Sequence, residues 1–361
     1  MGNLFAHIKN LFSTFPKIKS LEGLQRLDKA DVLFHNLVAE KKVPGLAVTI
    51  LDNGEQVLQK GYGFTDLEKR DKVDPKRTVF RIASISKCIT GLALGKMVED
   101  GIVDLDESFY TYVPYYPKKK YDFTLRQLAS HTAGIRGYKG KEFALNQAYS
   151  IKDSIAVFKN DPLLFEPGSD YLYNSFDFVL LSLVMQEASG VPFQDYVKEN
   201  ILMPLGLKHT FSPNEMDIDS GVVENKTQFY TKRAICFTEA AEVNNAYKLA
   251  GGGYLSTCED IAKLGQAILD RQLLQKETYN QLLTSQVVNG KPAYYGLGFQ
   301  VSQDAKGRPF FGHVGNSVGA YTNLFVYPRE QKVISILINC TDPKVQKELD
   351  LAIDAVFEIR A

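Results

Sequence analysis

The segment Phe80-Arg81-Ile82-Ala83-Ser84-Ile85-Ser86-Lys87 decides how the rest of the chain is interpreted, because it carries the one Ser-x-x-Lys pair in the sequence. The residues that follow predict a helix, since their apolar side chains recur at helical spacing: Ile85, Cys88, Ile89, Leu92 and Val98. Ser84 is then expected in the first turn of that helix, with Lys87 on the same face one turn along. An N-cap serine beside a solvated lysine would produce the same pattern, so the pair needs support from elsewhere in the chain.

The predicted placement of this pair has a chemical consequence. A serine hydroxyl is a poor nucleophile until a neighbouring base removes its proton. A lysine with an ordinary pKa near about 10.4 is not a base at neutral pH, but burial and the positive end of a helix both favour its neutral form. Free backbone N–H groups at the same helix end can hold a developing oxyanion. Ser84 and Lys87 are therefore a candidate nucleophile and base.

A second serine motif competes with this pair. Gly315-Asn316-Ser317-Val318-Gly319 matches the G-x-S-x-G elbow of α/β-hydrolases, which lies between a strand and a helix and is followed in the chain by its histidine. Here the residues from Tyr321 to Tyr327 alternate like a strand, and the last histidine, His313, precedes Ser317. We therefore expect these glycines to form a turn between strands.

The two ends of the chain share a pattern of helix and antiparallel strands. Near the start, apolar spacing predicts a helix from Leu21 to Lys41, and Asn53-Gly54 supplies the turn of a hairpin between Leu46–Leu51 and Gln56–Phe64. Near the end, alternating residues predict four strands and a closing helix: Tyr295–Ser302, Phe310–Val314, Tyr321–Tyr327, Lys332–Asn339 and Pro343–Ile359.

The middle of the chain is mainly helical. Helices are expected at Ile85–Glu99, Leu125–Ser130, Phe176–Ser189, Phe193–Ile201 and Ser256–Leu269. The predicted fold class is α/β, with an antiparallel sheet flanked by N- and C-terminal helices. The predicted organisation is an N-terminal extension at 1–20, an α/β sandwich from 21–82 and 288–361, and an inserted helical region at 83–287 that carries the nucleophile helix. A crevice where two such regions meet is a usual place for a small-molecule site.

The composition excludes several classes of protein. The 361 residues include 42 basic and 42 acidic side chains, so there is no basic excess to bind nucleic acid or an anionic membrane. No run approaches the roughly 20 apolar residues of a membrane-spanning helix. The 4 cysteines and 5 histidines form no C-x-x-C or H-E-x-x-H pattern, so neither a disulfide framework nor a zinc site is expected, and no other metal or cofactor is predicted.

The first twenty residues carry no continuous apolar centre and no small-residue cleavage site, so they do not resemble a secretory signal. A structural extension or surface helix is favoured here, and targeting or membrane contact is the alternative. A cytoplasmic location is therefore favoured over an organellar one.

Five segments, in order along the chain, resemble motifs of the penicillin-recognising serine hydrolases, specifically the class C β-lactamase and DD-peptidase group. They are the nucleophile segment Phe80–Lys87, Leu125–Ile135 ("LLSHTSG"), Phe165–Tyr173 ("PPGTxxxYSN"), Ala250–Thr257 ("AGGLxST") and Gly312–Gly315, the third motif. Phe158–Pro162 and Tyr247–Gly253 are most similar to the mitochondrial β-lactamase-like serine proteases and their bacterial relatives. The resemblance covers about Pro44 to Asn339 and implies a β-lactamase/transpeptidase-like fold.

The resemblance assigns roles residue by residue. Ser84 would be the acylated nucleophile, Lys87 its proton acceptor, and Tyr173 the phenol that passes the proton to the leaving group. The glycines at 251–253 would let the backbone pass close to the cleft. Three residues would lie beside the substrate on a strand edge: His313, Gly315 and Asn316, the last through a backbone N–H in the oxyanion hole.

Two positions depart from the family pattern. Ser175 stands where most relatives have an asparagine, which removes an amide able to bind both substrate and Lys87. His313 stands where lactamases have a lysine that attracts the antibiotic's carboxylate, and a histidine is largely uncharged at neutral pH. Both departures argue against efficient β-lactam hydrolysis.

The sequence thus predicts a serine hydrolase that acts through an acyl-enzyme on a short peptide, amide or ester, with peptidase-type chemistry favoured. A carboxylesterase of the same family is the nearest alternative. A catalytically silent binding or scaffold protein that retains the fold is an alternative of a different class. The expected partner is a small-molecule or short peptide substrate.

Overall fold

The computed structural model describes residues 15–218, 225–234 and 236–358. Its helices are α2 (Arg26–Ala39), α3 (Ser86–Glu99), α4 (Phe109–Tyr112), α5 (Leu125–Ala129), α6 (Ile151–Ser154), α7 (Phe176–Ser189), α8 (Phe193–Val197), α9 (Pro213–Ile218), α11 (Cys258–Leu269), α12 (Lys276–Leu282) and α13 (Gln346–Val356). Most of the predicted N-terminal extension, residues 1–14, lies outside the described residues, and the location linked to it stays a prediction.

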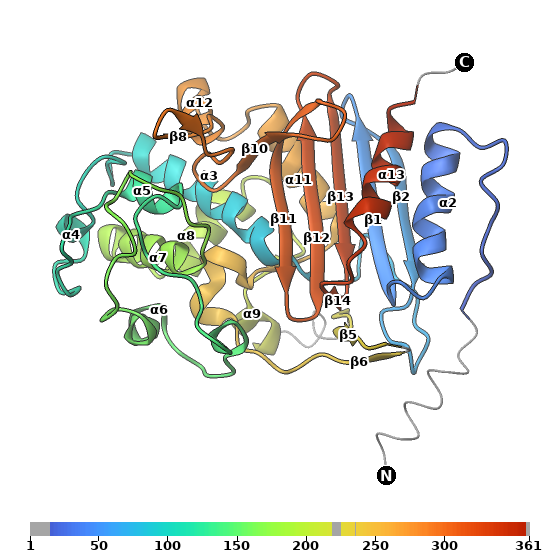
Figure 1. Cartoon of the computed structure of the whole chain (residues 1–361), viewed down its shortest axis with the longest axis horizontal. Coiled ribbons are helices and arrows are strands. Elements are labelled where there is room, and N and C mark those ends of the chain that lie inside the picture. The colour runs from blue at the N-terminus through green and yellow to red at the C-terminus, as the bar shows by residue number, and fades with distance from the viewer. Residues whose placement is uncertain (1–14, 219–224, 235, 359–361) are drawn as a thin grey trace, which may run out of the picture.

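A six-stranded antiparallel sheet forms the centre of the molecule, in the order β10-β11-β12-β13-β1-β2 (Figure 1). Its strands are β1 (Gly45–Asp52), β2 (Glu55–Gly63), β10 (Gln300–Gln303), β11 (Pro309–Ser317), β12 (Ala320–Tyr327) and β13 (Lys332–Ile338). Asn53 and Gly54 have φ angles of 51° and 80°, which confirms the predicted Asn-Gly turn between β1 and β2. The sheet is built from both ends of the chain, as the sequence predicts.

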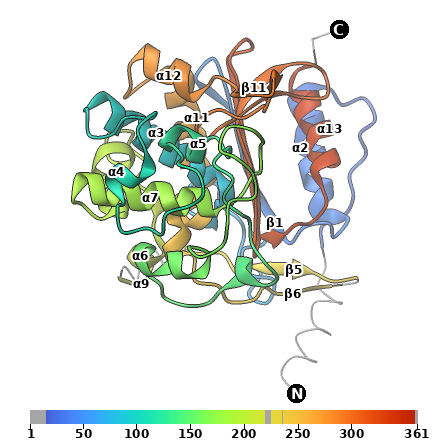
Figure 2. The same cartoon turned by 60° about the vertical axis from the view of Figure 1, so that its left-hand side comes forward.

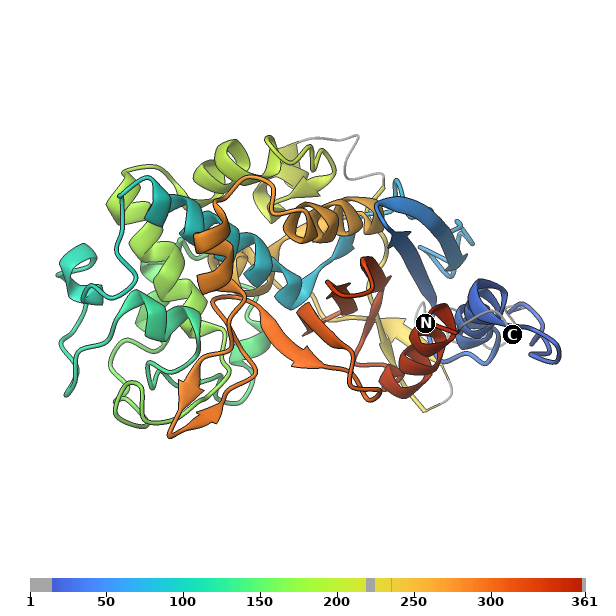
Figure 3. The same cartoon turned by 90° about the horizontal axis from the view of Figure 1, so that it is seen from above.

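The two faces of the sheet pack against different helices. Figures 2 and 3 show α2 and α13 together on the outer face, and α3, α11 and the rest of the helical region on the other side. The side chains of β13 point alternately to the two faces of the sheet, and both sets are apolar. Ile334, Ile336 and Ile338 belong to the outer apolar cluster, whereas Val333 and Leu337 belong to the inner one. Helix α11 approaches the inner face closely because Gly265 lacks a side chain: a Cβ there would lie 2.5 Å from Val333 Cγ1.

Short strands attach the helical region to the sheet layer. β3 (Phe80–Arg81), β7 (Leu255–Ser256) and β4 (Thr210–Phe211) form one small sheet, and β14 (Cys340–Thr341), β5 (Tyr230–Lys232) and β6 (Phe237–Glu239) form another; β8 (Val287–Val288) pairs with β9 (Lys291–Pro292). Because β3 runs directly into the Ser84 segment, the first small sheet fixes where the nucleophile helix begins. In the part of the chain that the structure describes, no single helix is long and apolar enough to cross a membrane; α7 and the following Phe193–Leu202 qualify only as a pair bent by 83°.

Several predicted boundaries differ from the structure, such as the strand expected at Phe310–Val314, which continues to Ser317. Three differences have a clear backbone cause. The first helix begins at Arg26 rather than Leu21, because Gly23 turns the chain with a φ of 73° and Gln25 is extended. The last helix is Gln346–Val356 rather than Pro343–Ile359, since Lys344 has a φ of 59°. The predicted strand Tyr295–Ser302 is a strand only from Gln300, because Gly298 (φ 90°) forms a turn beneath α3; a Cβ there would lie 2.6 Å from the Lys87 carbonyl oxygen.

Candidate active site

Ser84 lies in a 3-10 turn, Ala83–Ile85, that leads directly into α3. Ala83 adopts a left-handed φ of 48°, a conformation that costs an L-residue energy and that clusters at functional sites. Two hydrogen bonds hold this turn: Thr322 Oγ1 donates to the Ile82 carbonyl at 3.0 Å, and Ser86 Oγ donates to the Ala83 carbonyl at 2.7 Å. The sheet and the first turn of α3 therefore fix the backbone on which Ser84 is presented.

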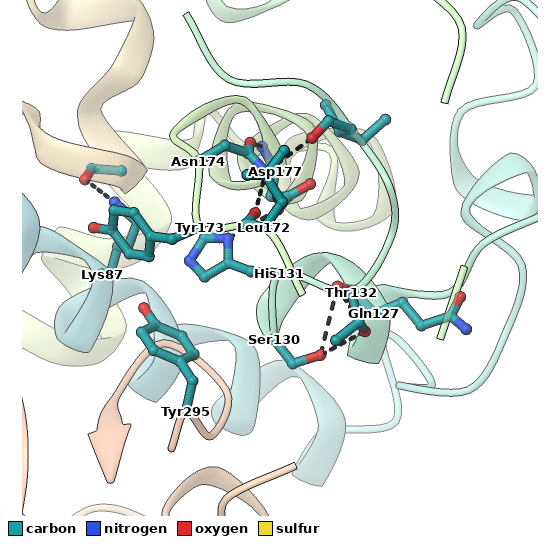
Figure 4. Close-up of polar contacts among 12 residues, drawn as sticks. Lys87, Gln127, Ser130, His131, Thr132, Leu172, Tyr173, Asn174, Asp177 and Tyr295 are labelled. Atoms are coloured by element: carbon teal, nitrogen blue, oxygen red, sulfur yellow. Dashed lines mark hydrogen bonds and ion pairs between the residues drawn. The ribbon is translucent and has the colours of Figure 1, made fainter. Parts of the chain in front are cut away.

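The structure brings Ser84, Lys87 and Tyr173 together. The Tyr173 hydroxyl donates to Ser84 Oγ at 2.7 Å, and Lys87 Nζ lies 3.4 Å from the same oxygen. Lys87 Nζ also donates to the Gly251 carbonyl at 2.6 Å, and it lies 4.8 Å from the centroid of the Tyr173 ring (Figure 4). Lys87 comes from α3, Tyr173 from the loop before α7, and Gly251 from the glycine segment 249–253, so three separate segments meet at the Lys87 amine.

The charge states of these groups follow from burial. Lys87 is fully buried, and burial lowers the pKa of its amine to about 7. The Tyr173 side chain is 38% exposed, but desolvation by the neighbouring groups raises the pKa of its phenol above the ordinary value, and the hydrogen bond with Ser84 opposes this shift. The phenol therefore keeps its proton at neutral pH. At neutral pH the site therefore holds a lysine that is partly an uncharged base and a tyrosine that remains a proton donor.

A buried pair supports Tyr173 from behind. His131 Nδ1 lies 2.8 Å from Asp177 Oδ2, and the centroid of the His131 ring lies 4.5 Å from that of Tyr173 and 4.8 Å from that of Tyr295 (Figure 4). Asn174 Nδ2 donates to the same Asp177 oxygen at 2.6 Å, and the Asp177 backbone N–H donates to Asn174 Oδ1 at 2.8 Å. Burial holds the pKa of His131 well below its usual range, so this ring packs as a neutral imidazole. The pair fixes the loop that carries Tyr173.

A cavity of about 270 Å³ opens beside the nucleophile. Its wall includes part of the nucleophile turn and of the glycine segment, and it extends over the end of β11 and two aromatic rings. The wall residues are Ala83, Ser84, Tyr138, Phe143, Ser175, Lys248, Gly251, Gly252, Asn316, Ser317, Val318, Thr341 and Asp342. Ser84, Ser175 and Asn316, three of the residues singled out from the sequence, therefore face one space.

His313 and Gly315, which were expected at the strand edge beside the substrate, do not line this cavity. His313 is fully buried; its Nε2 lies 3.0 Å from the Tyr295 hydroxyl, and its Nδ1 lies 2.7 Å from the Val314 carbonyl oxygen. Burial lowers the pKa of His313 to about 3, so it is uncharged, as the sequence suggested. Gly315 packs against the nucleophile turn instead: a Cβ there would lie 2.9 Å from the Ala83 Cβ.

Several groups at the site were not predicted from the sequence. The Gly251 carbonyl, which accepts from Lys87, lies in the glycine segment that was expected to pass close to the cleft or to contact the substrate. Asp177 and Tyr295 carry no local motif, and only their contacts with His131 and His313 show that they belong to the site. Among the described residues, no group of three or more histidine, cysteine, aspartate or glutamate side chains could hold a metal ion.

The protein has a β-lactamase/transpeptidase-like fold, which is a fold of serine hydrolases. Three features define it: an antiparallel sheet from both chain ends, an inserted helical region, and a Ser–Lys–Tyr centre where the two meet. The chain belongs to the Beta-lactamase family, whose model matches residues 30–357. The predicted family and fold class are thereby confirmed.

Three known proteins show the range of this similarity. The chain is 29% identical to the human (Homo sapiens) "Serine beta-lactamase-like protein LACTB, mitochondrial", over 82% of this chain and 71% of that protein. The octameric penicillin-binding protein homologue from Pyrococcus abyssi superimposes with a TM-score of 0.77 at 25% identity, over 90% of this chain and 76% of the other. The D-amino acid amidase from Ochrobactrum anthropi has a TM-score of 0.79 at 19% identity, over 91% and 98%, and shows the fold alone.

Proposed function

We propose that this chain is a serine hydrolase that forms an acyl-enzyme on Ser84 and acts on a short peptide, amide or ester. The observation that carries the proposal is the meeting of Ser84 Oγ with the Tyr173 hydroxyl at 2.7 Å and Lys87 Nζ at 3.4 Å beside an open cavity. A nucleophile within reach of a base, with that base oriented by a third group, is the arrangement that covalent catalysis requires. Here the Gly251 carbonyl orients Lys87.

The acylation step uses each group in the charge state described above. Neutral Lys87 accepts the proton of Ser84, whose oxygen forms a bond to the substrate carbonyl carbon. The tetrahedral intermediate then expels the leaving group as the bond from that carbon to nitrogen or oxygen breaks. Tyr173 gives its proton to the leaving group and takes one back from Lys87. Water repeats the sequence on the acyl-enzyme and releases the acid.

Strand β11 supplies a donor for the oxyanion. The Val314 N–H donates to the side chain of Gln300, away from β12, at 3.0 Å. Backbone N–H groups alternate along a strand, so the N–H of Asn316 points to the same side. Strand β10 pairs with β11 only as far as Gly312, which leaves the Asn316 N–H at an open edge beside the cavity. Together with the Ser84 N–H in the turn before α3, it forms the proposed oxyanion hole.

The third motif favours amide or ester substrates over β-lactams. His313 is neutral and buried against Tyr295, so it provides no cation at the position where lactamases bind the antibiotic's carboxylate. Ser175 lines the cavity without the amide that most relatives place there. Within this family a peptidase-type activity remains favoured, with a carboxylesterase as the alternative.

Intact-mass spectrometry after treatment with a fluorophosphonate tests the nucleophile. We expect one adduct that maps to Ser84 and is absent from Ser84→Ala. Ser317→Ala is the matched control, because Ser317 lines the same cavity and belongs to the competing G-x-S-x-G pattern, and it should keep the adduct. Loss of labelling in Ser317→Ala alone would favour Ser317 of the G-x-S-x-G pattern as the nucleophile. The absence of any adduct in the wild-type protein would favour a catalytically silent scaffold.

A further inference from the structure

Lys248 is a second buried lysine near the nucleophile, and it lines the cavity that also contains Ser84. Its side chain is only 6% exposed, and its amine donates to the Phe143 carbonyl at 2.7 Å. In the ranges 15–218, 225–234 and 236–358 it forms no ion pair. An ammonium group has three N–H donors, so one acceptor leaves this group partly unsatisfied.

The surroundings of Lys248 add positive rather than negative charge. Burial and, to a smaller extent, the Arg81 guanidinium together lower its pKa to about 8. Asp342 is the one carboxylate on the cavity wall, and it forms an ion pair with Lys344 instead. The centroids of the Tyr138 and Tyr247 rings lie 5.4 Å and 5.6 Å from the Lys248 amine. A buried charge without an opposite partner is costly, and a bound anion would remove that cost.

We propose that Lys248 binds a carboxylate carried by the acyl portion of the substrate, an inference that rests on the proposed hydrolase function. The cavity wall contains Ser84, Asn316 and Lys248 but not Tyr173, the proton donor to the leaving group. The part of the substrate that occupies the cavity is therefore the part that stays attached to Ser84 after the leaving group departs.

The size of the cavity limits the acyl group. A volume of about 270 Å³ is small for a ligand site and suits a single short residue. Ser84 and Lys248 face the same small space, so the carboxylate lies a few bonds from the reacting carbonyl. An acyl residue with an acidic side chain, such as glutamate, has this layout. The selectivity for an acidic acyl group thus comes from Lys248, which precedes the glycine segment. It does not come from the third motif, where His313 is neutral.

Two substrates of matched shape test this inference: N-acetyl-glutamyl and N-acetyl-glutaminyl 7-amido-4-methylcoumarin, each as both enantiomers. A hydrogen-bonded charge pair is worth about 1.5–3 kcal/mol, so we expect kcat/KM to favour the glutamyl substrate about tenfold or more. Lys248→Met should bring the ratio close to one, whereas Lys208→Met, which removes an exposed lysine elsewhere, should preserve it. A wild-type ratio near one, or an unchanged ratio in folded Lys248→Met, would overturn the inference.

A binding measurement separates this inference from the proposed function. In Ser84→Ala, titration calorimetry with N-acetyl-glutamyl amide and N-acetyl-glutaminyl amide should show about a tenfold difference in Kd, which the Ser84→Ala/Lys248→Met protein loses. If no substrate is hydrolysed but this discrimination persists, the hydrolase proposal fails and the Lys248 site stands. If both coumarin amides are hydrolysed and neither assay shows discrimination, the hydrolase stands and the Lys248 site fails. Circular dichroism and a melting curve confirm that each variant is folded.

Discussion

The outer and inner faces of the six-stranded sheet carry opposite kinds of packing. On the outer face, α2 and α13 pack on the sheet through an apolar cluster that includes Phe34, Leu37, Ile336, Leu349 and Ile353. On the inner side, the apolar cluster is larger, but it surrounds fully buried ionisable groups: Lys87, Asp177 and His313, with His131 1% exposed. One side of the sheet is therefore built for stability, and the other holds groups that cost stability.

The difference shows where this fold places its chemistry. Burial of a leucine side chain on the outer face contributes about 1.5–3 kcal/mol. Lowering the pKa of Lys87 from 10.5 to about 7 corresponds to a cost of roughly 5 kcal/mol at low pH. The outer cluster therefore offsets part of the cost of a desolvated base. Substitutions on the two faces should change stability and activity in different combinations.

The largest effect is expected for Lys87→Met, which should lower kcat/KM by about a thousandfold or more and also stabilise the protein. The folded pKa of Lys87 lies below its unfolded value, so its destabilisation is complete below about pH 7 and disappears as the pH rises toward 10.5. Part of the gain is lost because the Gly251 carbonyl loses its donor. We expect the free energy of unfolding to rise by about 1–3 kcal/mol at pH 6, measured by urea denaturation.

Lys60→Met is the matched control, because the Lys60 side chain is 47% exposed and pairs with Asp31 at the surface. It should change the free energy of unfolding by less than about 1 kcal/mol and leave activity intact. An inactive Lys87→Met protein that is less stable than the wild type at pH 6 would contradict the view that the buried, desolvated Lys87 destabilises the folded protein.

Leu349→Ala on the outer face should lower stability and leave activity nearly unchanged, the reverse of the effect expected for Lys87→Met. Leu349 is fully buried between α13 and the sheet, so its truncation should lower the free energy of unfolding by about 2–5 kcal/mol. The value of kcat per site labelled by a fluorophosphonate should stay within about twofold of the wild type, because the sheet separates Leu349 from Ser84. A large loss of kcat per labelled site would show that the two faces are coupled.

The outer layer could be predicted well because its signals are local. Alternation along β1 and β13, the Asn53-Gly54 turn and the apolar spacing of α2 each depend on residues close together in the sequence. The predicted helix ends were wrong where a single backbone angle decides the outcome, as at Gly23 and Lys344. Periodicity does not reveal such angles, because the side-chain pattern continues across them.

The inner side could be predicted only in part. Ser84 and Lys87 are three positions apart, so helical geometry alone brings them together, whereas Tyr173 was reached through the resemblance of its segment to a family motif. The Lys248 site and the contact between Tyr295 and His313 depend on segments far apart in the sequence. His313 was expected beside the substrate because motif matching gives a position but not the direction in which a side chain points.

Tyr173→Phe should lower kcat by about a hundredfold, because it removes one hydroxyl and keeps the ring that packs on His131. The free energy of unfolding should change by less than about 1 kcal/mol, since the lost hydrogen bond to Ser84 is the principal change. Stopped-flow and steady-state assays with an amide and an ester measure the effect. The amide should be the more affected, because its leaving group needs the proton more; equal activity to the wild type on both substrates would rule out Tyr173 as the proton donor.

The pH dependence of kcat/KM distinguishes Lys87 from Tyr173 as the base. The substrate is the neutral N-acetyl-glutaminyl coumarin amide, which carries no carboxylate for Lys248 to bind. If neutral Lys87 is the base, kcat/KM rises about tenfold per pH unit below pH 7 and levels off near pH 8, because the pKa of its amine is lowered to about 7. Neither inner-face histidine produces this limb: the pKa of His313 is lowered to about 3, and that of His131 lies well below its usual range. A phenolate base would instead give a rate that still rises above pH 9, because burial raises the pKa of Tyr173. A rate that still rises above pH 9 would identify Tyr173, in the loop before α7, as the base. Lys87 would then act only as a fixed positive charge on the inner side of the sheet.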